Sequence, residues 1–145
     1  MSDNSTMTRL QIERSAVETL YRAFSEKNPD LLDLAVTADW DDIPLAPGQG
    51  PGPEGFKPLL KGFIAAFPDI NITIHDLLQE PGKVAVRAEI TGTHQGEFMG
   101  IAATGKKISV RLHEFHQLDG QRITTTWHME DWFAMFLQIG QFPSL

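Results

Sequence analysis

The feature that most constrains the fold is a change in the spacing of apolar residues at about Ile70. Before it, apolar side chains recur every three or four residues, as at Val17, Leu20 and Phe24, which is typical of one face of an amphipathic helix. After it they recur at every second residue, as in residues 84–90, which is typical of strands. Helices followed by a run of strands predict an α+β fold with an antiparallel sheet.

The spacing of apolar residues, together with the positions of proline and glycine, predicts where each helix and strand begins and ends. The polar residues 1–7 predict a disordered tail, and residues 8–145 predict a single domain. Helices are expected at 8–27, at 31–36 and from about 53 to 67, and strands are expected to begin near 70, 84, 108 and 123.

A loop rich in proline and glycine separates the second and third predicted helices. Residues 44–55 hold four prolines and four glycines, which is more than a simple connection needs. Trp40 and Ile43 at its start favour a lid over a site, because a disordered segment has little use for large apolar side chains. We therefore count Trp40 among the candidate substrate-binding residues.

Charge and composition exclude several classes of partner. The chain carries 12 basic and 19 acidic residues, a net charge of −7, so it would repel nucleic acid and anionic membrane surfaces. No apolar run reaches the length of a membrane span, and the N-terminus lacks the order of a signal peptide. With no cysteine there is neither a disulfide framework nor a thiolate metal site. These features predict a cytoplasmic protein and a small uncharged or weakly acidic ligand.

The segment 123–140 carries the first candidate for chemistry. At period two, Ile123, Trp127 and Asp131 share one face of the last predicted strand. If that face lines a cavity, Asp131 is a desolvated carboxylate whose pKa rises into the range of a general base. The alternative is a surface aspartate at the end of the strand, with Trp127 in the core.

Four segments resemble the SnoaL-like polyketide cyclases, or ester cyclases, of the nuclear transport factor 2-like superfamily. They are GPEGFKPLLKGFIAAFPDI at 52–70, GTHQGEFMGIAATGKKISV at 92–110, LDGQRITTTW at 118–127 and WHMEDWFAMFLQIG at 127–140. The resemblance implies a cystatin-like cone, in which a curved antiparallel sheet wraps around N-terminal helices and encloses an apolar conical pocket. Such a fold hosts several chemistries, so it does not decide the function alone.

The resemblance also implies an activity. It implies a cyclase without a cofactor that closes a ring of a small, hydrophobic, polyketide-like substrate by an intramolecular aldol reaction, with Asp131 as the base and a histidine as its partner. It further implies a homodimer or a higher homo-oligomer. An isomerase, dehydratase or hydrolase on the same residues is the first alternative, and a non-catalytic protein that binds small molecules is the second.

The partner histidine depends on the register of the last hairpin. A two-residue turn at Asp119 and Gly120 places His116 on the face of Asp131, whereas a longer turn or a bulge places His113 and Phe115 there. Both histidines therefore remain candidates. By its parity relative to Asp131, His128 is expected on the outer face, and the scattered histidines predict no metal site.

Large apolar side chains are the candidates for the pocket wall. Aromatic and thioether side chains suit a flat polycyclic ligand, although each is also a plausible core residue. The candidates are Trp127, Trp40, Phe56, Phe63, Phe67 and Met99.

Overall fold

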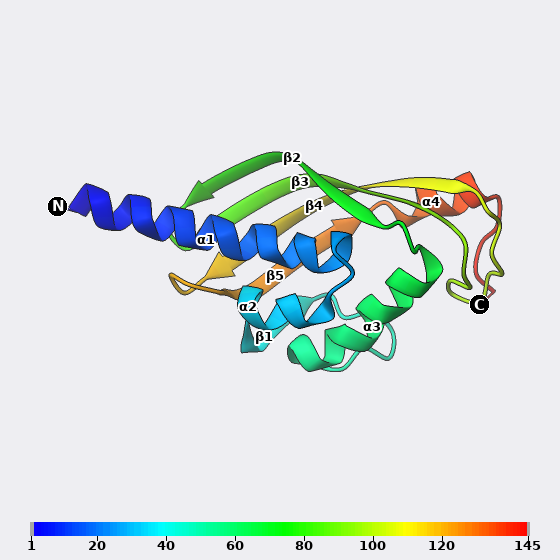
Figure 1. The fold of residues 1–145 in the computed structure, drawn as a ribbon, viewed down its shortest axis with the longest axis horizontal. Coiled ribbons are helices and arrows are strands. Elements are labelled where there is room, and N and C mark those ends of the chain that lie inside the picture. The colour runs from blue at the N-terminus through cyan, green and yellow to red at the C-terminus, as the bar shows by residue number, and fades with distance from the viewer. Residues whose placement is uncertain (1, 145) are drawn as a thin grey trace.

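Helices lie across one face of a strongly curved sheet of five strands (Figure 1). The structure is a computed structural model that describes residues 2–144, with side chains from Thr8 onward. The elements are α1 (Ser2–Ser25), a 3-10 turn η1 (Pro29–Leu31), α2 (Leu32–Ala35), β1 (Val36–Ile43), α3 (Gly52–Ala66), β2 (Asn71–Glu80), β3 (Lys83–Thr93), β4 (Lys107–Leu118), β5 (Ile123–Glu130) and α4 (Trp132–Ile139).

The strand order is β1-β5-β4-β3-β2. Strands β2 to β5 form antiparallel pairs along the chain, as the period-two pattern predicts. Strand β1 pairs with β5 in the parallel direction, so the sheet is mixed and its edges stay open. The predicted α+β architecture, a curved sheet around N-terminal helices, is confirmed, with this parallel edge strand as the correction.

Strand β1 occupies residues expected to be the end of a helix and the start of a loop. Its side chains alternate, with Trp40 and Asp42 buried and Asp39 and Asp41 exposed. Trp40 is therefore a core residue of a strand and does not begin a lid. The loop between β1 and α3 is shorter than expected, and its mobility remains a prediction.

Helix α1 is long and extends past the hairpin ends of the sheet (Figure 1). It begins at Ser2, within the segment for which composition predicts a disordered tail, and residue 1 lies outside the described residues. The division of the chain into a tail and one domain stays a prediction.

A buried glutamate on α1 fixes the helix to two hairpin turns. The Glu13 carboxylate accepts hydrogen bonds from the backbone N–H groups of Gly82 at 2.8 Å and Gly120 at 3.0 Å, and from Arg9 Nε at 3.3 Å. Because a buried charge is costly unless it is hydrogen-bonded, these contacts hold α1 in one place over the inner face of the sheet.

The register of β4 and β5 decides which histidine points inward. Side chains of β4 alternate strictly between exposed and buried. A bulge beside Leu118 pairs His116 with Thr126, and both are buried on the inner face. His113 lies on the exposed outer face, as does Phe115. The longer turn and the bulge thus put His113 and Phe115 on the face of Trp127, as expected for that register, but this face is the outer one, and of the two candidate histidines His116 points inward.

Candidate functional site

A group of polar side chains crosses the inner face of β1, β5 and β4. Cross-strand neighbours bring Glu114 beside His128 and His116 beside Thr126. The parallel pairing places Asp42 beside Thr126. We call this group, completed by one residue of α1, the interior polar cluster: Tyr21, Asp42, Glu114, His116, Thr126, His128 and Glu130.

The deepest part of the cluster is a neutral hydrogen-bonded chain. The Tyr21 hydroxyl lies 2.9 Å from His116 Nε2, and His116 Nδ1 lies 2.8 Å from Thr126 Oγ1. Trp40 Nε1 donates a hydrogen bond to the same Thr126 oxygen at 3.0 Å. His116 is 1% exposed, and burial lowers its pKa to about 3, with a smaller contribution from the charge of His128. The His116 imidazole is therefore neutral at physiological pH.

Glu114 is two residues from His116 on the same buried face of β4. It is 9% exposed, and burial raises its pKa to about 8, with the charge of Glu130 as the next cause. A hydrogen bond with the Tyr21 hydroxyl acts in the opposite sense and offsets only part of this rise. The Glu114 carboxyl is thus mostly protonated at pH 7 and becomes a carboxylate slightly above it.

His128 is held as a cation between acceptors. Its Nδ1 donates to the Glu130 carboxylate at 2.7 Å, and its Nε2 donates to the Pro44 carbonyl at 2.7 Å. Burial by itself lowers the His128 pKa, but the hydrogen bond to Glu130 and the charges of Glu130 and Asp42 outweigh it and raise the pKa to about 9. This residue, expected outside, faces the interior.

Asp42 connects the cluster to the loop after β1. It is 5% exposed, and its Oδ1 lies 3.4 Å from His128 Nε2. Its Oδ2 accepts a hydrogen bond from Gln49 Nε2 at 2.8 Å, while Gln49 Oε1 accepts from the Ala46 N–H at 2.9 Å. Burial raises the Asp42 pKa, and the Gln49 hydrogen bond partly offsets that effect.

Aromatic side chains from several elements form a continuous wall beside the sheet. Phe63 stacks on Trp132 with ring centres 5.7 Å apart, and Phe98 contacts both. At the other end Trp40 meets Phe56 edge to face at 5.5 Å. The aromatic wall consists of Phe24, Trp40, Phe56, Phe63, Phe98 and Trp132.

The residues expected to line the pocket lie in the aromatic wall, in the buried core or at the surface. Phe56 and Phe63 belong to the aromatic wall together with Trp40, and Phe67 lies in the buried core against Phe98. Met99 is 56% exposed in the loop between β3 and β4. Trp127 is 39% exposed on the outer face of the sheet, so the expectation that it lines the pocket is wrong.

Asp131 has a different setting from the one expected. Strand β5 ends at Glu130, and Asp131 caps α4 by accepting a hydrogen bond at Oδ1 from the Ala134 N–H at 3.1 Å. Its side chain is exposed, so it is not a desolvated carboxylate that shares a strand face with an indole. The structure therefore brings His116 into the interior and leaves Asp131 and His113 at the surface.

One sequence signal could have found the missed carboxyl. Glu114 and His116 continue the alternation of Ile108, Val110 and Leu112, which predicts burial for all five positions. An ionisable group at such a position is a functional candidate.

The described residues contain neither a candidate metal site nor a membrane-spanning helix. Within residues 2–144, no group of three or more His, Cys, Asp or Glu side chains is arranged to hold a metal ion. No described helix is both long enough and apolar enough to cross a membrane.

Comparisons with known proteins bear on the family and on the fold. A family model described as SnoaL-like polyketide cyclase matches residues 14–139. TsrD from Streptomyces laurentii superposes with a TM-score of 0.81 at 23% identity, over 89% of this chain and 95% of that one. IdmH from Streptomyces antibioticus, described as a candidate polyketide cyclase, gives 0.76 at 27% identity over 88% and 98%. A candidate polyketide cyclase from Bacillus cereus gives 0.75 at 30% identity over 86% and 78%. No curated protein sequence matches the chain.

Proposed function

The chain belongs to the SnoaL-like polyketide cyclase family, and we propose that it is a cyclase without a cofactor that closes a ring by intramolecular aldol addition. One observation carries the proposal: Glu114 and His128 are cross-strand neighbours inside the sheet, with pKa values raised to about 8 and about 9. Enolate chemistry requires a carboxylate base next to an imidazolium acid, and the pKa values of these two groups lie only slightly above neutral pH.

In the proposed mechanism Glu114 removes a proton from a carbon next to a carbonyl group. The resulting enolate oxygen accepts a hydrogen bond from His128 Nε2, which in the free protein donates to the Pro44 carbonyl. The enolate carbon then attacks a second carbonyl of the same molecule, and the new alkoxide takes the His128 proton. Transfer of the proton from Glu114 to His128 restores both groups, so the product is an isomer of the substrate.

The aromatic wall would contribute by folding the substrate. A flexible polyketide must bring two distant carbons together, and holding reacting groups in place can lower a barrier by about 7 to 11 kcal/mol in well-oriented cases. Flat rings such as Phe63 and Trp132 offer a surface for conjugated segments. Tyr21 and His116 would hold the hydrogen bonding around Glu114 in a defined arrangement.

The proposal is tested by the pH dependence of ring closure. A linear 1,5-diketone is incubated with the protein, and the cyclic product is followed by chiral chromatography. Because Glu114 must be ionised and His128 protonated, kcat/KM should rise up to about pH 8 and fall above about pH 9. Glu114→Gln should remove the rising limb and lower the rate by about 10² to 10⁴-fold. A variant at an exposed glutamate, Glu97→Gln, is the control.

The outcomes separate the alternatives. Proton exchange without ring closure would support an isomerase or a dehydratase that shares the first step. Neither exchange nor closure, with tight binding of cyclic ketones, would support a non-catalytic binding protein. A pH profile that Glu114→Gln leaves unchanged would contradict the assignment of the base.

We also propose that the protein is a homodimer that buries the outer face of its sheet. One row of apolar side chains crosses all five strands on that face, which we call the outer apolar row. It consists of Leu78, Ala85, Phe115, Trp127 and Ile43. Acidic and basic residues alternate beside it, as in the Arg87 and Asp76 ion pair, so two acidic chains can meet there without strong repulsion.

A further inference from the structure

The loop that follows β1 occupies the proton donor of the interior polar cluster. The Pro44 carbonyl accepts a hydrogen bond from His128 Nε2 at 2.7 Å. The two Glu130 carboxylate oxygens lie 2.7 and 3.0 Å from the other ring nitrogen, Nδ1. A carbonyl and a carboxylate can only accept, so both ring nitrogens carry protons and both N–H groups are engaged. A ligand that takes a hydrogen bond from this ring must therefore displace one of the two acceptors.

Of the two acceptors, the Pro44 carbonyl is the easier one to displace. A hydrogen bond to a charged acceptor is roughly twice as strong as one to a neutral acceptor, and Glu130 is also fixed within β5. Pro44 follows the last residue of β1 and is exposed, and its neighbour Leu45 is 48% exposed. Because little packing holds this part of the chain, the position of the carbonyl depends on the hydrogen bonds of the loop.

We call residues 44–49 the gate loop, and both of its ends are fixed. Ile43 before it still pairs with β5. After it, the Gly50 backbone lies so close to Gly55 of α3 that a side chain on Gly55 would collide with it. Within the loop, Gly48 has a φ of 82°, a left-handed conformation that glycine adopts without strain. The gate loop is thus a short exposed segment between two fixed points.

Gln49 holds the gate loop closed through both ends of its side-chain amide. Its Oε1 accepts a hydrogen bond from the Ala46 N–H at 2.9 Å, and its backbone N–H donates to the Ala46 carbonyl at 3.0 Å. Its Nε2 donates to Asp42 Oδ2 at 2.8 Å, while Asp42 Oδ1 lies 3.4 Å from His128 Nε2. Gln49 therefore ties the loop to the carboxylate that stands beside the proton donor.

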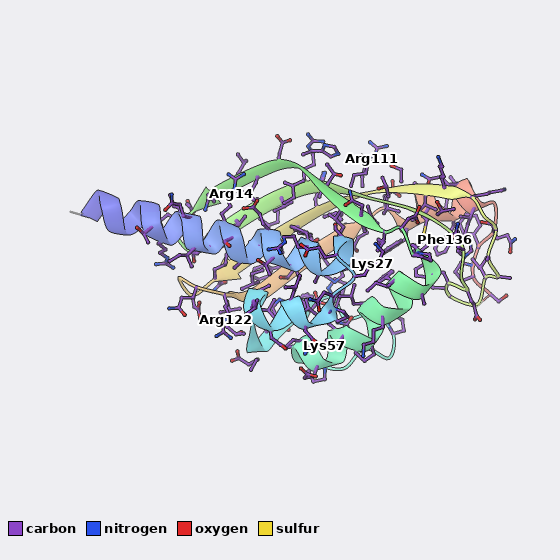
Figure 2. All side chains as sticks on the ribbon, viewed as in Figure 1. Arg14, Lys27, Lys57, Arg111, Arg122 and Phe136 are labelled. Atoms are coloured by element: carbon purple, nitrogen blue, oxygen red, sulfur yellow. The ribbon has the colours of Figure 1, made fainter. Side chains whose placement is uncertain are left out.

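Among the described residues, Asp42 has no lysine or arginine partner that could take the place of Gln49. Lys57, on α3, is bonded to Asp33 and Glu54, and Figure 2 shows it at the outer edge of the molecule. The connection between the gate loop and the Asp42 carboxylate therefore depends on the Gln49 amide.

We propose that a substrate carbonyl opens the gate loop by replacing the Pro44 carbonyl on His128 Nε2, and that Gln49 is the residue that holds the loop closed until then. The inference rests on the proposed function, because it takes His128 as the acid that meets the enolate oxygen. It adds Gln49 as a positioning residue for that acid. The chain's own carbonyl thus competes with the substrate carbonyl for one N–H group.

Loss of the Gln49 side chain should therefore strengthen ligand binding, although it removes hydrogen bonds from the protein. When only a small fraction of the protein is open, the apparent dissociation constant is the intrinsic constant divided by that fraction. A hydrogen bond to a charged group changes an equilibrium constant by on the order of tenfold. Without the bond from Gln49 to Asp42, the open fraction and the affinity for a ketone should both rise about five- to tenfold. A purely structural role of Gln49 predicts unchanged or weaker binding.

The test measures the binding of 2-tetralone, a neutral bicyclic ketone, by calorimetry at pH 7. Gln49→Ala removes the side-chain amide, whereas Gln49→Glu keeps its size and the acceptor for the Ala46 N–H but cannot donate to Asp42. Both variants should bind the ketone about five- to tenfold more tightly than wild type. Gln121→Ala changes an exposed glutamine in the turn between β4 and β5 and should bind it as wild type does.

Two spectroscopic readouts follow the loop and the proton donor themselves. The backbone amide at position 49, which is bonded to the Ala46 carbonyl in the closed loop, should exchange its hydrogen faster in both Gln49 variants. In wild type, 2-tetralone should shift the ¹⁵N signal of His128 Nε2. Tetralin, which has the same skeleton without the oxygen, should leave that signal nearly unchanged.

The gate loop and the proposed cyclase activity can fail separately. Unchanged or weaker ketone binding in the Gln49 variants, no binding by any of the proteins, or a His128 signal that 2-tetralone does not shift would overturn the gate. Tighter ketone binding in the Gln49 variants, with no exchange of carbon-bound protons in any protein, would keep the gate and refute the cyclase. An active enzyme whose ketone affinity does not depend on Gln49 would do the reverse.

Discussion

Replacing Glu114 with glutamine should stabilise the folded protein above neutral pH. The raised pKa means that the folded state holds its proton up to about pH 8, whereas the unfolded chain releases it near 4.5. The stability linked to this proton is therefore fully present below pH 4.5 and is lost as pH rises through about 8. Glutamine keeps the shape and a hydrogen-bonding group but never ionises.

The size of the effect follows from the two pKa values. The difference between about 8 and 4.5, at about 1.4 kcal/mol per pKa unit, gives about 5 kcal/mol as an upper value. Water entry and relaxation around the carboxylate reduce it, so we expect a gain of about 2 to 5 kcal/mol at pH 9. At pH 4 to 5 the two proteins should differ by less than about 1 kcal/mol, because both then carry a neutral side chain.

The assay is urea unfolding of wild type, Glu114→Gln and the exposed control Glu97→Gln at pH 5, 7 and 9. The free energy of unfolding of Glu114→Gln, relative to wild type, should increase with pH, and that of the control should not. A Glu114→Gln protein that is less stable than wild type at pH 9, or a difference that does not depend on pH, would refute the electrostatic argument.

Three further predictions concern other parts of the molecule. Asp131→Ala should lower the free energy of unfolding by about 1 kcal/mol through loss of the α4 cap, whereas Asp131→Asn should retain most of it; equal loss in both would argue against capping. Activity should survive exhaustive EDTA treatment, and a loss that zinc or iron specifically restores would reveal a metal. Trp127→Lys should convert the proposed dimer to monomers in light scattering, since it introduces a charge into the outer apolar row; an unchanged mass would place the interface elsewhere.

The sequence predicts the class of fold because each spacing of apolar residues is typical of one kind of secondary structure. The spacing of Val17, Leu20 and Phe24 matches a helix, and the alternation in β3 and β4 matches strands with one buried face. Strand β1 was not predicted as a strand because Asp39, Asp41 and Asp42 lower its apolar content. Its pairing with β5 is set by tertiary contacts.

The site was harder to predict because it depends on where a strand ends and on one bulge. The period-two pattern extends Asp131 onto the face of Trp127, but the chain turns into α4 directly after Glu130. A turn of residues 119–122, longer than two residues, and a bulge beside Leu118 together place His116 opposite Thr126 instead of Ile123, and the sequence leaves both possibilities open. The raised pKa of Glu114 arises from burial and from Glu130 on the neighbouring strand, which a linear sequence does not place together. The pKa of His128 is raised mainly by Glu130, two residues along the same strand, but the burial of this pair on the inner face depends on the register.

The most direct measurement compares carbon-acid exchange in two variants. The rate at which the protein exchanges the α-proton of a neutral β-keto ester for deuterium is followed by NMR in wild type, Glu114→Gln and Asp131→Asn at pH 8. The account predicts that Glu114→Gln loses about 10² to 10⁴-fold while remaining folded, and that Asp131→Asn keeps the wild-type rate within a few-fold. Full activity in Glu114→Gln together with loss in a stable Asp131→Asn would contradict the account and move the base to the start of α4.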